Sequence, residues 1–147
     1  MRILLYPFAV IAAAGFVLSL ATHLMALAGH APPGGGLVWG LHFGIFAVWI
    51  PAVWIGNRNV RRLDRKLDWK DTMAGCPVWM RRALQVVFVY AIINFVLFML
   101  TTAGHPRPIG RAPAFVLRGF SGHWMTFYGA AFAALYSALK TPTTPPT

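Results

Sequence analysis

Five histidines are the residues of this chain with the greatest potential for chemistry, and three of them fall inside long apolar segments. His23 lies near the end of the first such segment, His42 near the start of the second, and His123 near the start of the fourth. At 1.5 Å per helical residue, His23 and His42 would each lie about 9 Å inside one membrane boundary, and His123 about 6 Å. Imidazoles gathered at one depth can ligate copper, zinc or a haem iron. The pattern makes these three histidines the candidate ligands of a metal or cofactor.

The histidines also fit two alternative roles. The first, which we favour, is purely structural, because each ring can form hydrogen bonds to Ser, Thr or carbonyl groups of a neighbouring helix. The second is a site for a quinone-like molecule or a lipid headgroup, whose anion-binding part would consist of three cations: Arg107, Arg111 and Arg118. Met25 and Met125 lie two residues from a histidine, but helix residues two apart face different directions.

The sequence gives little support to enzymatic chemistry. Cys76 is the only cysteine, which excludes an internal disulfide and a cysteine-based metal cluster. The chain contains no Walker A, G-x-G-x-x-G or H-E-x-x-H motif. It also lacks a recognisable set of nucleophile, base and acid. We therefore predict no catalytic residues.

Composition places the histidines in a membrane. Of the 147 residues, 58% are apolar and only 11% are charged, whereas soluble domains average roughly 25% charged residues. Four segments reach the length of about 20 apolar residues that a membrane-spanning helix needs: residues 3–28, 36–55, 83–102 and 119–139. We predict an all-α integral membrane protein, with one domain over residues 1–140 and four transmembrane helices in an up-down-up-down bundle.

The basic residues predict the orientation of this bundle. Ten of the thirteen Lys and Arg would fall on one side of the membrane, eight of them in the loop 57–82, and three on the other. Cytoplasmic loops are enriched in Lys and Arg, so we expect both termini in the cytoplasm, in a bacterial inner (plasma) membrane. This topology also explains the net charge of +10 without a nucleic-acid partner. The alternative for the first segment is a cleaved signal peptide, although its apolar run exceeds the usual 7–15 residues.

The segments outside the expected spans suggest contact with lipid. Val60, Leu63 and Leu67 recur at helical spacing among basic residues, which predicts a short basic amphipathic helix on the anionic inner leaflet. A solvated loop without a partner is the alternative. The tail 141–147 contains only Thr and Pro and is predicted to be disordered.

Small residues at four-residue spacing indicate where helices can approach closely. They are Gly36, Gly40 and Gly44 in the second segment and Gly15 and Ser19 in the first. Each set can pack inside the bundle or against a partner helix. Asn94, near the centre of the third segment, needs a hydrogen-bond partner within the protein.

Taken together, these features favour a non-catalytic accessory or interaction subunit of a larger membrane complex or of a homo-oligomer. One alternative is a metal- or haem-binding, redox-related membrane protein that uses the three histidines. The second alternative is an oligomeric transporter or channel. Four helices are few for alternating access, and no Asp, Glu or Lys lies inside a span to relay protons.

Overall fold

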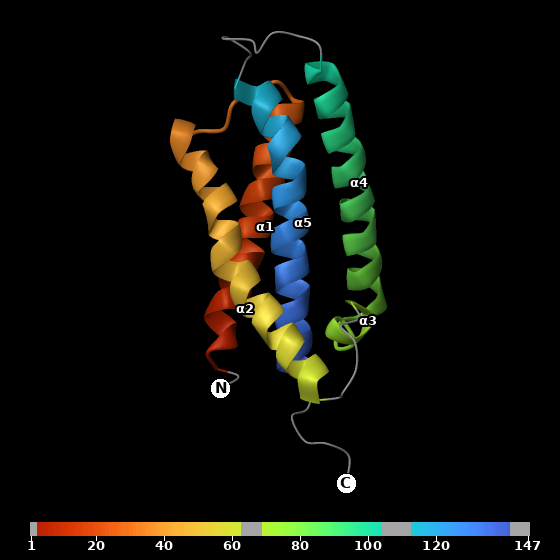
Figure 1. The fold of residues 1–147 in the computed structure, drawn as a ribbon. Helices are drawn as coiled ribbons and strands as arrows, with labels where there is room; N and C mark the ends of the chain where they lie inside the picture. Colours follow the sequence, from red (N-terminus) through yellow and green to blue (C-terminus); the bar gives the residue numbers. More distant parts are fainter. Residues whose placement is uncertain (1–2, 63–68, 104–112, 142–147) are drawn as a thin grey trace.

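The computed structural model describes residues 3–62, 69–103 and 113–141, and every regular element in these ranges is helical. The elements are α1 (Leu5–Leu27), the 3₁₀ helix η1 (Gly35–Trp39), α2 (Gly40–Arg62), α3 (Trp69–Thr72), α4 (Val78–Thr102) and α5 (Pro113–Lys140). The long helices lie side by side, and successive ones run in opposite directions (Figure 1). The start of α1 and the end of α5 therefore lie at the same end of the bundle.

Three helical segments are long and apolar enough to cross a membrane: α1, the stretch Gly35–Asn57 formed by η1 and most of α2, and α4. Their outer surfaces carry large apolar side chains, such as Val10, Phe43 and Leu100, each about two-thirds exposed. Soluble proteins rarely expose apolar surface over such an extent. The chain is thus an all-helical protein with the features of an integral membrane protein.

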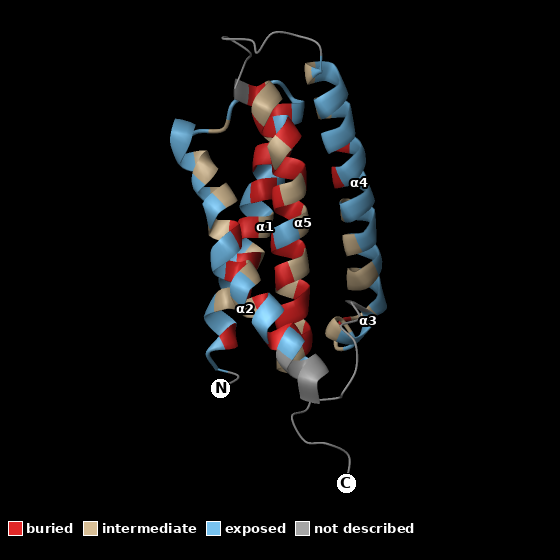
Figure 2. Ribbon diagram, viewed as in Figure 1, coloured by how far each residue is buried: buried red, intermediate tan, exposed pale blue. Residues whose placement is uncertain are grey.

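The helix α5 differs from these three and lies at the centre of the bundle. It packs against α1, α2 and α4, and half of its residues are buried while only three of the described ones are exposed (Figure 2). Trp124, Ala131 and Leu135 are fully enclosed. Because α5 packs against the other long helices over much of its surface, it can carry Ser, His and Tyr side chains that lower its hydropathy. This explains why the expected fourth span is not among the helices that qualify by apolar composition.

Three helices extend beyond the expected spans. α2 continues to Arg62 instead of ending at residue 55, α4 begins at Val78 instead of residue 83, and α5 begins at Pro113 instead of residue 119. Hydropathy does not detect the Arg-rich turns at the end of α2 and the start of α4. The added turn of α5 is mostly apolar and is separated from the expected span only by Arg118. Of the expected amphipathic helix, Val60 belongs to α2, whereas Leu63 and Leu67 lie outside the described residues. Residues 142–147 of the tail lie outside them as well.

A stripe of glycines on α5 holds α4 close. A Cβ atom on Gly122 would lie 3.1 Å from the Asn94 side-chain nitrogen and 3.7 Å from the Cα atom of Ala91. Gly119 and Gly129, on the same face, meet the side chains of Phe98 and Leu84. The amide of Asn94 donates a hydrogen bond of 2.9 Å to the Arg118 carbonyl, so this buried polar residue has its partner inside the bundle. α4 is thus attached to the bundle chiefly through α5.

Tyr128 of α5 joins α1 and α2 to this central helix. Its ring packs on Gly15 and its hydroxyl lies over Gly44, where in both cases a Cβ atom would overlap it. The hydroxyl also donates a hydrogen bond of 2.8 Å to the Leu41 carbonyl. Gly15 and Gly44 therefore serve packing within the bundle. Gly36 and Gly40 do not, because no described atom outside the adjoining stretch of chain lies within 4 Å of the position their Cβ atoms would take.

The connection between α3 and α4 is fixed to the end of α5. The Gly75 N–H donates to the Ser137 hydroxyl at 2.9 Å, and the Cys76 thiol donates to the Ala133 carbonyl at 3.2 Å. Cys76 is only 5% exposed. Its burial raises the pKa of the thiol, an effect that the positive charge of Arg81 and a hydrogen bond involving Ser137 only partly oppose.

This environment predicts slow labelling of Cys76 by N-ethylmaleimide at pH 7.5. The thiolate is the reacting form, and a raised pKa lowers its population while burial limits access. The rate should rise with pH and on unfolding in SDS. A matched control moves the thiol two residues, to exposed Ala74, in a Cys76→Ser, Ala74→Cys variant. Equal labelling rates for the native thiol and the control would contradict the described packing.

Candidate functional site

His23 is a structural link between three helices. Its Nδ1 atom lies 2.7 Å from the Ser121 hydroxyl of α5, and its Nε2 atom lies 2.5 Å from the Tyr90 hydroxyl of α4. The side chain is 2% exposed. Both ring nitrogens of His23 are thus engaged within the bundle, and neither points to a ligand.

We expect His23→Leu to lower the free energy of unfolding by about 1–2 kcal/mol, because hydrogen bonds between membrane helices have roughly this strength. The substitution removes two hydrogen bonds and leaves the buried Ser121 hydroxyl without its partner. Tyr90→Phe removes only one of these hydrogen bonds and should cost about half as much. SDS titration in mixed micelles measures both values. Equal stability of all three proteins would show that this link contributes nothing.

His42 and His123 come together, apart from His23. Their ring centroids are 5.8 Å apart and their planes are nearly perpendicular, at 84°. Ser121 and His123 are two residues apart on α5 and so face different directions, which separates the pair from His23. Aromatic side chains surround the two rings: Trp39, Phe43, Phe95, Phe120, Trp124 and Phe127.

The hydrogen bond from Trp124 determines the tautomer of His42. The indole Nε1–H lies 3.0 Å from His42 Nδ1, and an indole nitrogen can only donate. His42 Nδ1 is therefore unprotonated, and a neutral ring carries its proton on Nε2. Metal-bound histidines usually show the opposite arrangement, with one nitrogen on the metal and the other donating to a carbonyl or carboxylate. His42 is consequently arranged as a hydrogen-bond donor and not as a metal ligand.

These contacts do not fit the expected cofactor site of His23, His42 and His123. Within the described ranges, no three His, Cys, Asp or Glu side chains lie close enough together to hold a metal ion. A haem between His42 and His123 would need a flat gap, but the rings of Phe120 and Trp124 each lie against both histidines. The sequence predicts one depth for the three residues, but the rotation of α1 directs His23 to other neighbours than His42 and His123 have.

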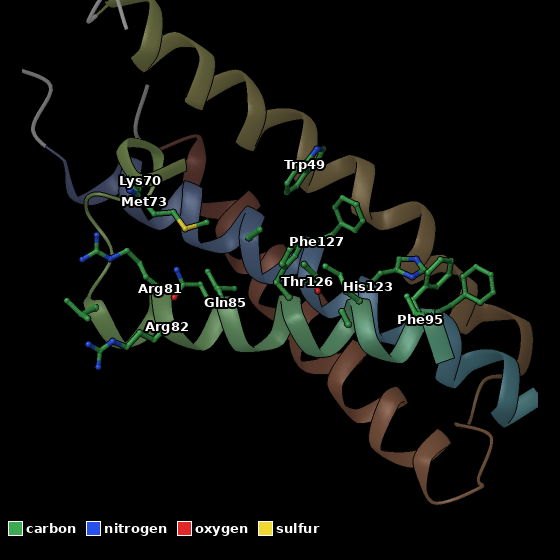
Figure 3. A pocket seen from close by; sticks show the side chains of 18 residues that line it. Trp49, Lys70, Met73, Arg81, Arg82, Gln85, Phe95, His123, Thr126 and Phe127 are labelled. Carbon is green, nitrogen blue, oxygen red and sulfur yellow. The ribbon is translucent and has the colours of Figure 1, made fainter. Parts of the chain in front are cut away.

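An apolar groove is the feature of the bundle best suited to hold a ligand. It has a volume of about 1060 Å³ and runs over α5 between α2 and α4. Figure 3 shows Lys70, Arg81 and Arg82 at one end and Phe95 and His123 at the other. Between these ends the lining is almost entirely aromatic and aliphatic, and includes Trp49, Phe88, Ile92 and Phe127.

The groove exists because α2 and α4 leave a strip of the α5 surface uncovered between them. α4 packs on the Gly119–Gly122–Gly129 face of α5, and α2 packs on another face. The strip that carries Thr126, Phe127 and Ala130 lies between them and lines the groove. The sequence marks this part of the chain as unusual, because three glycines and four aromatic residues lie between Gly119 and Gly129. It does not predict the groove, which depends on how the neighbouring helices cover α5.

The cations expected at a headgroup site have different positions. Arg107 and Arg111 lie outside the described residues, and Arg118 is exposed on α5. Arg81 and Arg82, which the sequence marks only as signals of topology, line the groove instead. The basic part of the candidate site is therefore at the opposite end of the bundle from the one expected.

The chain matches no known protein-family model, no curated protein and no solved structure. The candidate site is defined by this chain's own residues: the groove over α5, its basic end at Arg81 and Arg82, and its far end at His123.

Proposed function

We propose that this chain is an integral membrane protein that binds the hydrocarbon tail of a membrane amphiphile in the groove between α2 and α4. The observation that supports this proposal is the shape and lining of the groove: about 1060 Å³, elongated along the helices, and apolar over most of its length. Small-molecule sites occupy roughly 300–1,000 Å³ and are mostly apolar with a few polar groups. A groove parallel to membrane helices suits a hydrocarbon tail, because the tails of membrane lipids already lie along the bilayer normal.

The proposal includes the orientation of the bundle. We propose that α5 crosses the membrane together with the three apolar segments, because its 28 residues run alongside all of them. Both termini would then be cytoplasmic. The end of the bundle that carries Arg81, Arg82 and Lys140 would face the anionic inner leaflet of a bacterial plasma membrane.

Lipid retention tests the proposal. The protein is equilibrated in micelles that contain dioleoyl phosphatidylcholine and dioleoyl phosphatidylglycerol in equal amounts, and its mass is then measured in the native state. We expect one retained lipid per chain. Ala130→Trp, which places an indole in the groove, should abolish retention. Ala14→Trp, the same change at an exposed position of α1, should leave it unaltered. Equal retention by both variants would mean that the bound lipid lies elsewhere.

A second candidate function is the interaction subunit that the sequence favours. The specific observation is the open face at Gly36 and Gly40, where added side chains would meet nothing within 4 Å. A helix of a larger complex or of a second copy could approach this face closely, and an oligomeric channel or transporter would need such a contact. Gly40→Leu should then abolish the association seen after crosslinking in membranes while the chain stays folded. An unchanged crosslinking pattern would exclude this face.

A further inference from the structure

We infer that the amphiphile in the groove is an anionic phospholipid whose phosphate binds Arg81 and Arg82, with an acyl chain that runs along α5 toward His123. This inference rests on the proposed function and specifies its ligand. It depends on the charge at one end of the groove, the depth of that end, and the length of the apolar part.

The charge at the basic end is of one sign. Arg81, Arg82 and Lys70 line it, and none of the described residues that line the groove is acidic. Guanidinium groups stay protonated and match phosphate oxygens with paired N–H donors. Arg81 is half-buried against the groove and Arg82 is exposed at its rim. One guanidinium can therefore contact the phosphate from inside while the other meets it from the water side.

The depth of these cations suits a headgroup. Arg81 and Arg82 lie in the first turns of α4, directly after the helix begins at Val78. Trp79, in the same turn, is 68% exposed, and Trp is enriched where membrane helices leave the hydrocarbon layer. The basic end is thus expected at the membrane boundary, with the remainder of the groove inside the apolar layer.

The length of the groove suits an acyl chain. From Arg81 to Phe95 the groove follows α4 for 14 residues, or about 21 Å at 1.5 Å per residue. Half of the hydrocarbon layer is about 15 Å deep. The acyl chain of a phospholipid whose phosphate is held at Arg81 can therefore stay in the groove across the whole leaflet. The far end offers His123 and Phe95 but no cation, so the two ends are not equivalent and the lipid has one preferred direction.

Competition between two lipids with identical tails tests the inference. Native mass spectrometry is repeated with equal amounts of dioleoyl phosphatidylglycerol and dioleoyl phosphatidylcholine. A basic residue near the membrane surface adds about fivefold in affinity for anionic lipid, so the two arginines predict a preference of roughly 25-fold for phosphatidylglycerol. The double variant Arg81→Gln, Arg82→Gln should retain one lipid but keep no more than the roughly fivefold preference that Lys70 alone can supply. The control Arg118→Gln removes an exposed cation at the other end of the bundle and should keep the preference.

The remaining outcomes separate the inference from the proposed function. If every protein retains a lipid without preference, the inference fails and the proposed function stands. If no protein retains a lipid, the proposed function fails as well. A preference lost in Arg118→Gln instead would place the phosphate at the opposite end and overturn the inference.

A lipid-free dimer would show that a helix of a second copy fills the groove, and displacement by 10 mM inorganic phosphate would show a site for the free ion. Both would also overturn the inference. Circular dichroism confirms that each variant is helical.

Discussion

Tyr128→Ala is expected to lower the free energy of unfolding by about 3 kcal/mol, the largest effect of any single truncation that we predict. The ring of Tyr128 fills the space between Gly15 of α1 and Gly44 of α2, two positions where no Cβ atom fits. Its removal would leave a cavity bounded by two glycines, which have no side chains to fill it. In lipid the separated helices stay in an apolar medium, so what is lost is packing and not transfer from water.

Graded variants separate the contributions of this side chain. Tyr128→Phe keeps the ring and removes only the hydrogen bond to the Leu41 carbonyl, so it should cost about 0.5–1.5 kcal/mol. Tyr6→Ala removes a tyrosine that is 58% exposed on α1 and should cost little. Reversible SDS unfolding, followed by tryptophan fluorescence, measures all three. A loss for Tyr128→Ala no larger than that for Tyr6→Ala would refute the three-helix contact.

Gly122→Leu is expected to separate α4 from α5. The missing Cβ atom at Gly122 lets the Ala91 backbone and the Asn94 side chain lie against α5, and a branched side chain there must push α4 outward. Overpacking typically costs about 1–3 kcal/mol. The effect on lipid binding should be larger than the effect on stability, because α4 forms one wall of the groove. We expect the variant to lose its retained lipid in native mass spectrometry.

The control for this variant is Gly40→Leu, which adds the same side chain where no atom lies within 4 Å. Its stability and its lipid retention should match those of the unmodified protein. Full retention of lipid by Gly122→Leu would mean that α4 can move outward without opening the groove.

Apolar length predicts where the long helices lie in the chain but not their rotation. Residues 3–28 and α1 nearly coincide, because a long apolar run has few other stable forms in a bilayer. The same residues do not reveal that His23 faces Ser121 while His123 faces His42. That difference depends on how far each helix is turned about its axis, and composition is unaffected by such a turn.

The glycines show the same limit. Gly36, Gly40 and Gly44 have identical spacing, yet Gly44 alone meets a side chain, that of Tyr128. Spacing predicts where a helix can approach but not which helix does so. The groove was beyond prediction for a related reason, since it is formed by what α2 and α4 leave uncovered on α5.

The attachment of α4 to α5 has a consequence for biosynthesis. A ribosome completes α4 before it has made the helix on which α4 packs. The 38 residues between Thr102 and Lys140 take about 2–8 s to synthesise at 5–20 residues per second. During that interval α4 lacks its main packing partner and can join α1 only through contacts such as that between His23 and Tyr90, whereas α1 and α2 already contact each other. Assembly of the bundle must therefore wait for α5, and a chain truncated after residue 112 would consist of a helical hairpin and a third helix without its main packing surface.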